Sequence, residues 1–224
     1  MKHRFDRRTL LHAAVGGVGA FYLPRAAVVS QPSVSATLEI ENLGEALFVV
    51  RGAGCNVVVA RGPDGGATMV DGGLKERSAE LLSLVRSDLS VSRIDTLFNS
   101  CWHPDRTGAN EALGAAGTRI MAHENTRLWL GRGVTRPWDT VTIKRLPPQA
   151  CPNATFYEPG VVAVSGREVR YGYLLQAHTD GDSYVHFPTE NILVTGAAIS
   201  ANTWPLLDWW TGGWIGGLVD AFEL

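Results

Sequence analysis

The chain has 224 residues, of which 45% are hydrophobic and 19% are charged, and its formal net charge is -2 at pH 7. A chain of this length and apolar content can bury a sizeable core, so we expect one globular domain. The nearly balanced charge gives no electrostatic reason to expect nucleic acid as a partner, and we predict none.

The N-terminus, residues 1–36, carries the features of an export signal followed by a linker. A basic region ends in the pair Arg7-Arg8, and a short apolar run follows over residues 9–23. The "DRRTLL" core resembles a twin-arginine signal, and the run is too short to span a bilayer comfortably. A membrane anchor is the main alternative. A cytoplasmic amphipathic start is disfavoured because the apolar residues form no helical stripe.

We therefore predict export to the periplasm or beyond the cell, with no stable membrane insertion once the signal is removed. The mature domain is expected over residues 37–224. The sequence does not indicate an oligomeric state.

The mature domain begins with runs that predict β-strands. These runs are rich in β-branched residues and punctuated by glycine, and "RGPDGGA" is a strong turn signal between two of them. Residues 75–87 then show apolar positions at helical spacing. The three strand-like runs are residues 47–52, 55–60 and 68–73.

Strand and helix signals alternate in the middle of the chain. Residues 94–100 predict a short buried strand, 108–117 a helix with a glycine stop, and 118–124 the next strand. More strand-like runs follow at residues 160–166, 168–178, 183–187 and 191–196. Two sheets with helices outside them accommodate this order.

The stretch "NSCWHPDRTGAN", residues 99–110, concentrates groups that bind metals. It follows a predicted strand and precedes a predicted helix, a position from which side chains can project into a cleft. Cys101 and His103 alternate, so both can point to one side, and Asp105 follows at the same interval. Zinc accepts thiolate, imidazole and carboxylate ligands. On its own, this short pattern is as compatible with chance or a purely structural role as it is with a metal site.

The same stretch resembles the H-x-H-x-D-H segment of the metallo-β-lactamase superfamily. "VDGG" at residues 70–73 resembles the superfamily's earlier Asp-containing strand end, and residues 177–197 resemble its later His-Thr-x-Gly-Asp strand and the turn beyond. These matches occur in order from about Leu43 to Asp220. The resemblance implies an α/β fold, the four-layer αββα sandwich, with its C-terminal portion incomplete.

The departures from the motif bear on the metal. His103, Asp105 and His178 are retained, whereas Cys101 stands at the first His position and Arg106 at the last. The expected bridging Asp is replaced by Ala197, and the family's final His ligand has no counterpart before the chain ends at Leu224. The resemblance therefore implies one zinc ion held by Cys101, His103 and His178. Of the second site, which is expected to be lost, only Asp105 remains.

The function implied is that of an exported hydrolase with a single zinc ion. It would activate water against a small ester, lactam or thioester, and Asp105 would orient that water or accept its proton. One alternative is a catalytically impaired or non-enzymatic member that binds a metal or ligand, and another is a shortened gene product that folds poorly.

Several other residues receive structural interpretations. We expect Asp182 to accept hydrogen bonds from loop amides and Asp71 to support the site. His123 and His186 lack ligand neighbours and are expected to be structural. The tryptophans of "WPLLDWWTGGW" fit core packing or an exposed surface better than a substrate lip.

The three cysteines, Cys55, Cys101 and Cys151, are an odd number, so no disulfide framework is implied. Cys55 reads as a small buried apolar residue and Cys151 as an exposed loop residue.

Overall fold

The structure is a computed structural model that describes residues 37–200 and 204–223. The predicted export signal and linker, residues 1–36, lie outside the described residues. Among the helices that are described, none combines the length and the apolar character needed to cross a membrane.

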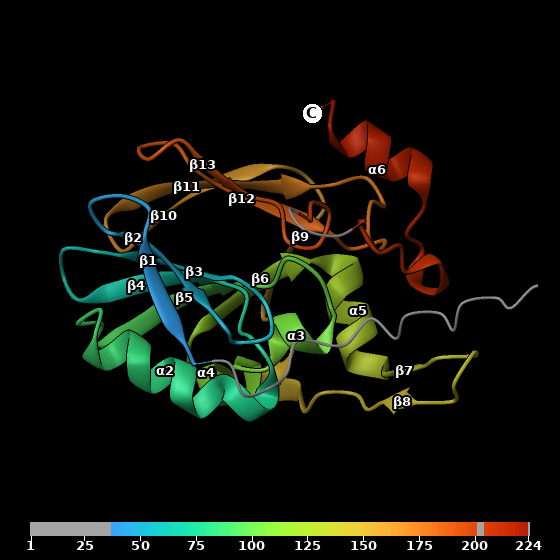
Figure 1. Cartoon of the computed structure of the whole chain (residues 1–224), viewed down its shortest axis with the longest axis horizontal. Coiled ribbons are helices and arrows are strands. Elements are labelled where there is room, and N and C mark those ends of the chain that lie inside the picture. Colours follow the sequence, from blue (N-terminus) through green and yellow to red (C-terminus); the bar gives the residue numbers. More distant parts are fainter. Residues whose placement is uncertain (1–36, 201–203, 224) are drawn as a thin grey trace, which may run out of the picture. The chain divides into compact units, whose positions relative to one another are not determined.

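Two β-sheets, a larger mixed one and a smaller antiparallel one, form the centre of the domain (Figure 1). The larger one has seven strands in the order β1-β2-β3-β4-β5-β6-β9; β1 to β4 are antiparallel, and β4, β5, β6 and β9 pair in parallel. Its strands are β1 (Glu39–Asn42), β2 (Leu47–Arg51), β3 (Val57–Arg61), β4 (Gly66–Val70), β5 (Arg93–Phe98), β6 (Arg119–His123) and β9 (Ala154–Phe156).

The smaller sheet has four antiparallel strands in the order β10-β11-β12-β13, and a separate two-stranded hairpin joins β7 to β8. The strands are β10 (Gly160–Val164), β11 (Arg167–Tyr173), β12 (Ser183–Phe187), β13 (Ile192–Val194), β7 (Val134–Thr135) and β8 (Thr142–Ile143). The helices are η1 (Lys75–Arg77), α2 (Ser78–Ser87), α3 (Pro104–Thr107), α4 (Asn110–Ala115), α5 (Glu124–Arg132), η2 (Pro148–Ala150), η3 (Trp209–Thr211) and α6 (Ile215–Ala221).

Strand β3 shows why the sheet has layers on both sides. Val57 and Val59 pack into a core with the apolar face of α2, whereas Val58 and Ala60 pack into a second core with the smaller sheet. A strand buried on both faces reads as a continuous apolar run, which is what "VVVA" is. Figure 1 shows α2 and α4 on one face of the large sheet and β10–β13 over the other.

Helix α6 supplies the outer helix next to the smaller sheet. Leu218 packs there with Leu174 and Ala177, which follow β11. The α/β arrangement of two packed sheets with helices outside, predicted from the sequence, is therefore confirmed.

Two details differ from the sequence-based expectation. The strand predicted over 168–178 ends at Tyr173, and the chain leaves the sheet before His178. Cys151, expected to be exposed, is partly buried, because it packs with the cluster around Trp102 and Leu130. All three cysteines are free thiols.

Candidate metal centre

The loop after β5 presents Cys101 and His103, and hydrogen bonds hold it in place. Asp71, at the end of β4, accepts the backbone N–H of Ser100 at 2.8 Å through Oδ1 and the Ser100 hydroxyl at 2.7 Å through Oδ2. Asn99 at the start of the loop exchanges two side-chain hydrogen bonds with Asn110 of α4, at 3.0 and 2.8 Å. Asp71 thus supports the loop from behind, as predicted.

His178 lies in the connection between β11 and β12, which Asp182 organises. The Asp182 carboxylate accepts the backbone N–H of His178, and it accepts the backbone N–H and the hydroxyl of Thr179, each at 2.7 Å. Burial raises the pKa of Asp182 to about 6, although these three donors act in the opposite direction. The predicted role of Asp182 as an acceptor for loop amides is confirmed.

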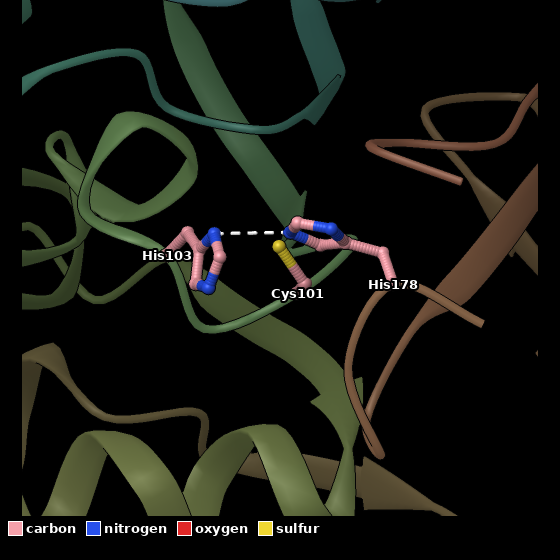
Figure 2. A group of neighbouring side chains, drawn as sticks. All are labelled: Cys101, His103 and His178. Atoms are coloured by element: carbon pink, nitrogen blue, oxygen red, sulfur yellow. Dashed lines mark hydrogen bonds between the residues drawn. The ribbon is translucent and has the colours of Figure 1, made fainter. Parts of the chain in front are cut away.

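The two loops bring Cys101, His103 and His178 together (Figure 2). Cys101 Sγ and one ring nitrogen of each histidine lie within 4.8 Å of one another, and His103 Nδ1 is 3.0 Å from His178 Nε2. Ligands of a tetrahedral zinc ion are separated by roughly 3–4 Å, so this spacing suits one shared ion.

The hydrogen bonds behind the two imidazoles fix their tautomers. His178 Nδ1 contacts the carbonyl oxygen of Leu206, which can only accept, so Nδ1 must carry the hydrogen. His103 Nε2 lies 2.9 Å from Asp208 Oδ2 and donates to that carboxylate. The facing nitrogens then both present lone pairs across 3.0 Å, and only a proton or a cation between them relieves the repulsion.

These contacts match the way proteins orient metal-binding histidines, in which the outer ring nitrogen donates to a carboxylate or a backbone carbonyl. Burial, followed by the neighbouring His103, lowers the pKa of His178 to about 4, which keeps it neutral and able to bind a cation. The residues present therefore fit a zinc ion.

Cys101 is fully buried, and burial raises the pKa of its thiol well above the usual range. The nearby carboxylate of Asp182 acts in the same direction, and the guanidinium of Arg106 opposes it. Only the thiolate binds zinc, so metal binding must displace this proton.

Asp105 is not part of the three-residue group. Its Oδ2 lies 3.2 Å from Nε of Arg106, and Nη1 of the same guanidinium lies 3.2 Å from Asp71 Oδ2. The Arg106 guanidinium thus lies between the carboxylates of Asp71 and Asp105. The reason is local: α3 begins at Pro104, so the alternation that places Cys101 and His103 on one side does not extend to Asp105.

The sequence interpretation missed Asp208 and Leu206. Asp208 is the only charged residue between Glu190 and Asp220, and that isolation was an available signal. Leu206 acts through its carbonyl oxygen, which no side-chain pattern reveals. The expectation for His123 holds, since its ring stacks on Tyr173 with centroids 4.1 Å apart and its Nδ1 accepts the backbone N–H of Asn125.

Comparisons with known proteins agree with this geometry. The family model described as the metallo-beta-lactamase superfamily matches residues 50–222. The chain is similar to the solved structure of a metallo-beta-lactamase from Pontibacter korlensis, with 19% identity, 84% of each chain covered and a TM-score of 0.65. It is also similar to the metallo-beta-lactamase DIM-1, with 19% identity, 84% of this chain and 82% of that chain covered, and a TM-score of 0.62. TMB-1 gives 18% identity, coverage of 84% and 83%, and a TM-score of 0.63. No curated protein matches the chain. At these identities the structural likeness shows the fold alone.

Proposed function

This chain belongs to the metallo-β-lactamase superfamily, and from that premise we propose that it is an exported hydrolase with one zinc ion. Its substrate class would be a small ester, lactam or thioester. The observation that carries the proposal is the cluster of Cys101, His103 and His178, in which each imidazole is held by an acceptor oxygen behind it.

Zinc bound to this cluster would supply Lewis acidity and make water a stronger nucleophile near neutral pH. Three protein ligands leave a fourth position open, as in catalytic zinc sites. Asp208 and the Leu206 carbonyl hold the two rings so that their free nitrogens face each other across 3.0 Å, within 4.8 Å of Cys101 Sγ. Because little side-chain motion is then needed on binding, the site is preorganised.

We assign the proton-handling role to Asp105. Its side chain is 34% exposed and can be reached by solvent and substrate, whereas Asp71 and Asp182 are buried and engaged by loop donors. Its contact with Arg106 places a cation beside the carboxylate, and a carboxylate at this position is a suitable acceptor of the proton from the attacking water. The same pairing also favours the alternative of a catalytically impaired, metal-binding member, because Arg106 restricts the carboxylate.

The deciding experiment combines metal content with turnover. Purified residues 37–224 should bind about one zinc per chain and hydrolyse at least one compound in a panel of chromogenic esters, thioesters and lactams, and Asp105→Asn should lower kcat without removing zinc. One bound zinc without turnover would favour the non-enzymatic alternative. Absence of zinc binding would overturn both.

The twin-arginine route in the export proposal depends on the pair Arg7-Arg8. Replacing Arg7 and Arg8 with lysine should retain the protein in the cytoplasm, as measured by cell fractionation, whereas Arg25→Lys should leave export unchanged. Export of the double-lysine variant would contradict the twin-arginine route.

A further inference from the structure

We propose that the substrates of the metal centre carry an aliphatic acyl group. We further propose that this acyl group binds to the exposed surface formed by Trp138, Trp209 and Trp210, which we call the tryptophan ledge. This inference rests on the proposed hydrolase function and specifies its substrate class.

The tryptophan ledge is formed by two segments that are distant in the sequence. Trp138 belongs to the connection between β7 and β8, and its ring centroid lies 6.0 Å from that of Trp209 in η3. The Trp209 and Trp210 rings meet edge to face at 5.6 Å. The three side chains remain 56%, 64% and 45% exposed, respectively. Three neighbouring tryptophans left this exposed are unusual on a surface without a binding role.

The turn that carries two of these rings is firmly anchored. Asp208 Oδ2 accepts the Thr211 hydroxyl at 2.7 Å, and the indole N–H of buried Trp102 donates to the same hydroxyl at 3.1 Å. Gly213 packs so closely on the His178 carbonyl that an added Cβ would lie 2.0 Å from its oxygen. The turn that carries Trp209 and Trp210 is therefore in place before a ligand arrives, which lowers the entropic cost of binding.

The segment that carries Trp209 and Trp210 also holds the two imidazoles of the metal centre. Leu206 and Asp208, which bond to His178 and His103, immediately precede Trp209 and Trp210 in the chain. In the proposed complex, the substituent of a carbonyl compound bound at the cluster extends along this shared segment toward the rings.

Few charged groups lie in the segment that carries Trp209 and Trp210. The one carboxylate between Glu190 and Asp220 is that of Asp208, which already bonds to His103. In the neighbouring segment, Arg136 pairs with Asp139 at 2.6 Å and the Arg132 guanidinium lies 4.2 Å from the Trp129 ring centroid.

The ring angles favour a chain over a planar group. Trp138 and Trp209 are inclined at 41°, and Trp209 and Trp210 at 85°. Such rings form a corner rather than a parallel slot, and a flexible chain can follow a corner.

The test measures binding, so it does not depend on turnover. Butyrate, hexanoate, octanoate and decanoate, the products of acyl-ester hydrolysis, are titrated by calorimetry into the zinc-loaded and the zinc-free protein. We expect the affinity to rise about two- to fourfold per methylene group in both forms. Trp209→Ala and Trp210→Ala should flatten this dependence and leave butyrate affinity unchanged. Val161→Ala, which alters an exposed apolar residue of β10, is the matched control and should preserve it.

Equal zinc content and circular dichroism of the tryptophan variants establish that they fold. A chain-length dependence without any hydrolysis would support the ledge and count against the proposed activity. An affinity independent of chain length, or a dependence unchanged in both tryptophan variants, would overturn the inference. A dimer that dissociates in Trp209→Ala would also overturn the inference, because it would assign the ledge to a contact with a second copy. Tryptophan-dependent binding to phosphatidylcholine vesicles without a chain-length effect would overturn it too, because it would assign the ledge to a membrane.

Discussion

His103 Nδ1 and His178 Nε2 face each other across 3.0 Å, and each ring is held from behind by an acceptor oxygen. This arrangement requires a positively charged centre between the rings, either a proton or a metal ion. Cys101 Sγ belongs to the same cluster, and its thiolate would add the negative charge that a dication favours over a proton.

The first prediction concerns zinc itself. Replacing His178 with Ala should abolish stoichiometric zinc binding, because two ligands cannot hold the ion tightly. Zinc at 100 times its dissociation constant should stabilise the normal protein by about 2.7 kcal/mol, and this gain should vanish in the variant. Metal analysis and thermal unfolding measure the two effects. His186→Ala, on β12, is the control and should retain the ion. A variant at position 178 with one zinc per chain would rule out the site.

The second prediction concerns the carboxylate behind His103. Asp208→Ala should weaken zinc binding by roughly 10- to 100-fold, because the His103 ring loses the group that fixes its orientation and tautomer. Competition with a chelator measures the affinity. Asp220→Ala removes a carboxylate from α6 of the same segment and should leave the affinity unchanged. Equal affinities for the two variants would show that Asp208 does not position His103.

The fold and much of the site could be predicted from the sequence, because both follow from local patterns. Apolar runs bounded by glycine mark the strands, and the alternating positions of Cys101 and His103 in the sequence predict that both face one site, which their clustering bears out. The position of His178 relied on the family resemblance, since nothing local links it to a loop 75 residues earlier.

The remaining contacts depend on tertiary structure. The bond between His103 and Asp208 joins residues 105 apart, and the contact to His178 comes from a backbone carbonyl, so neither leaves a pattern in the sequence. Asp105 lies outside the cluster because the chain changes from extended to helical at Pro104. Because the backbone changes from extended to helical within this short motif, residue spacing alone does not predict which of its side chains face the same site.

The third prediction concerns Arg106, whose guanidinium lies between Asp71 and Asp105. Asp71 is 1% exposed, so Arg106→Ala would leave a buried carboxylate without its cation and should lower the free energy of unfolding by about 3 kcal/mol. Urea unfolding measures this loss. Adding Asp71→Asn should recover part of it, because the uncompensated charge is then removed.

Arg93→Ala is the control for Arg106. Arg93 pairs with Asp64 and Asp95 on the surface, where its side chain is 50% exposed, and its loss should cost less than about 1 kcal/mol. If Arg106→Ala and Arg93→Ala lowered the free energy of unfolding by similar amounts, the buried position of Arg106 would not make its ion pair more stabilising than a surface pair.

The last prediction concerns the pH dependence of stability through His123. Burial lowers the pKa of His123 below its ordinary value of 6.5, against the opposing effect of Glu124. Below pH 6.5 the unfolded chain therefore binds a proton more readily than the folded one, so this residue lowers stability as the pH falls and has no effect well above pH 6.5. Protonation would also remove Nδ1 as the acceptor for Asn125 at the start of α5.

Urea unfolding is measured between pH 5 and 8 with a chelator present. The free energy of unfolding should fall as the pH is lowered in the normal protein, and it should fall less in His123→Gln. The metal site is the same in both proteins, so its contribution cancels in the comparison. Tyr173→Phe keeps the stacked ring and should keep the pH dependence while losing the hydrogen bond from its hydroxyl to the Asp180 carbonyl. Parallel curves for the normal protein and His123→Gln would show that the buried imidazole does not couple folding to pH.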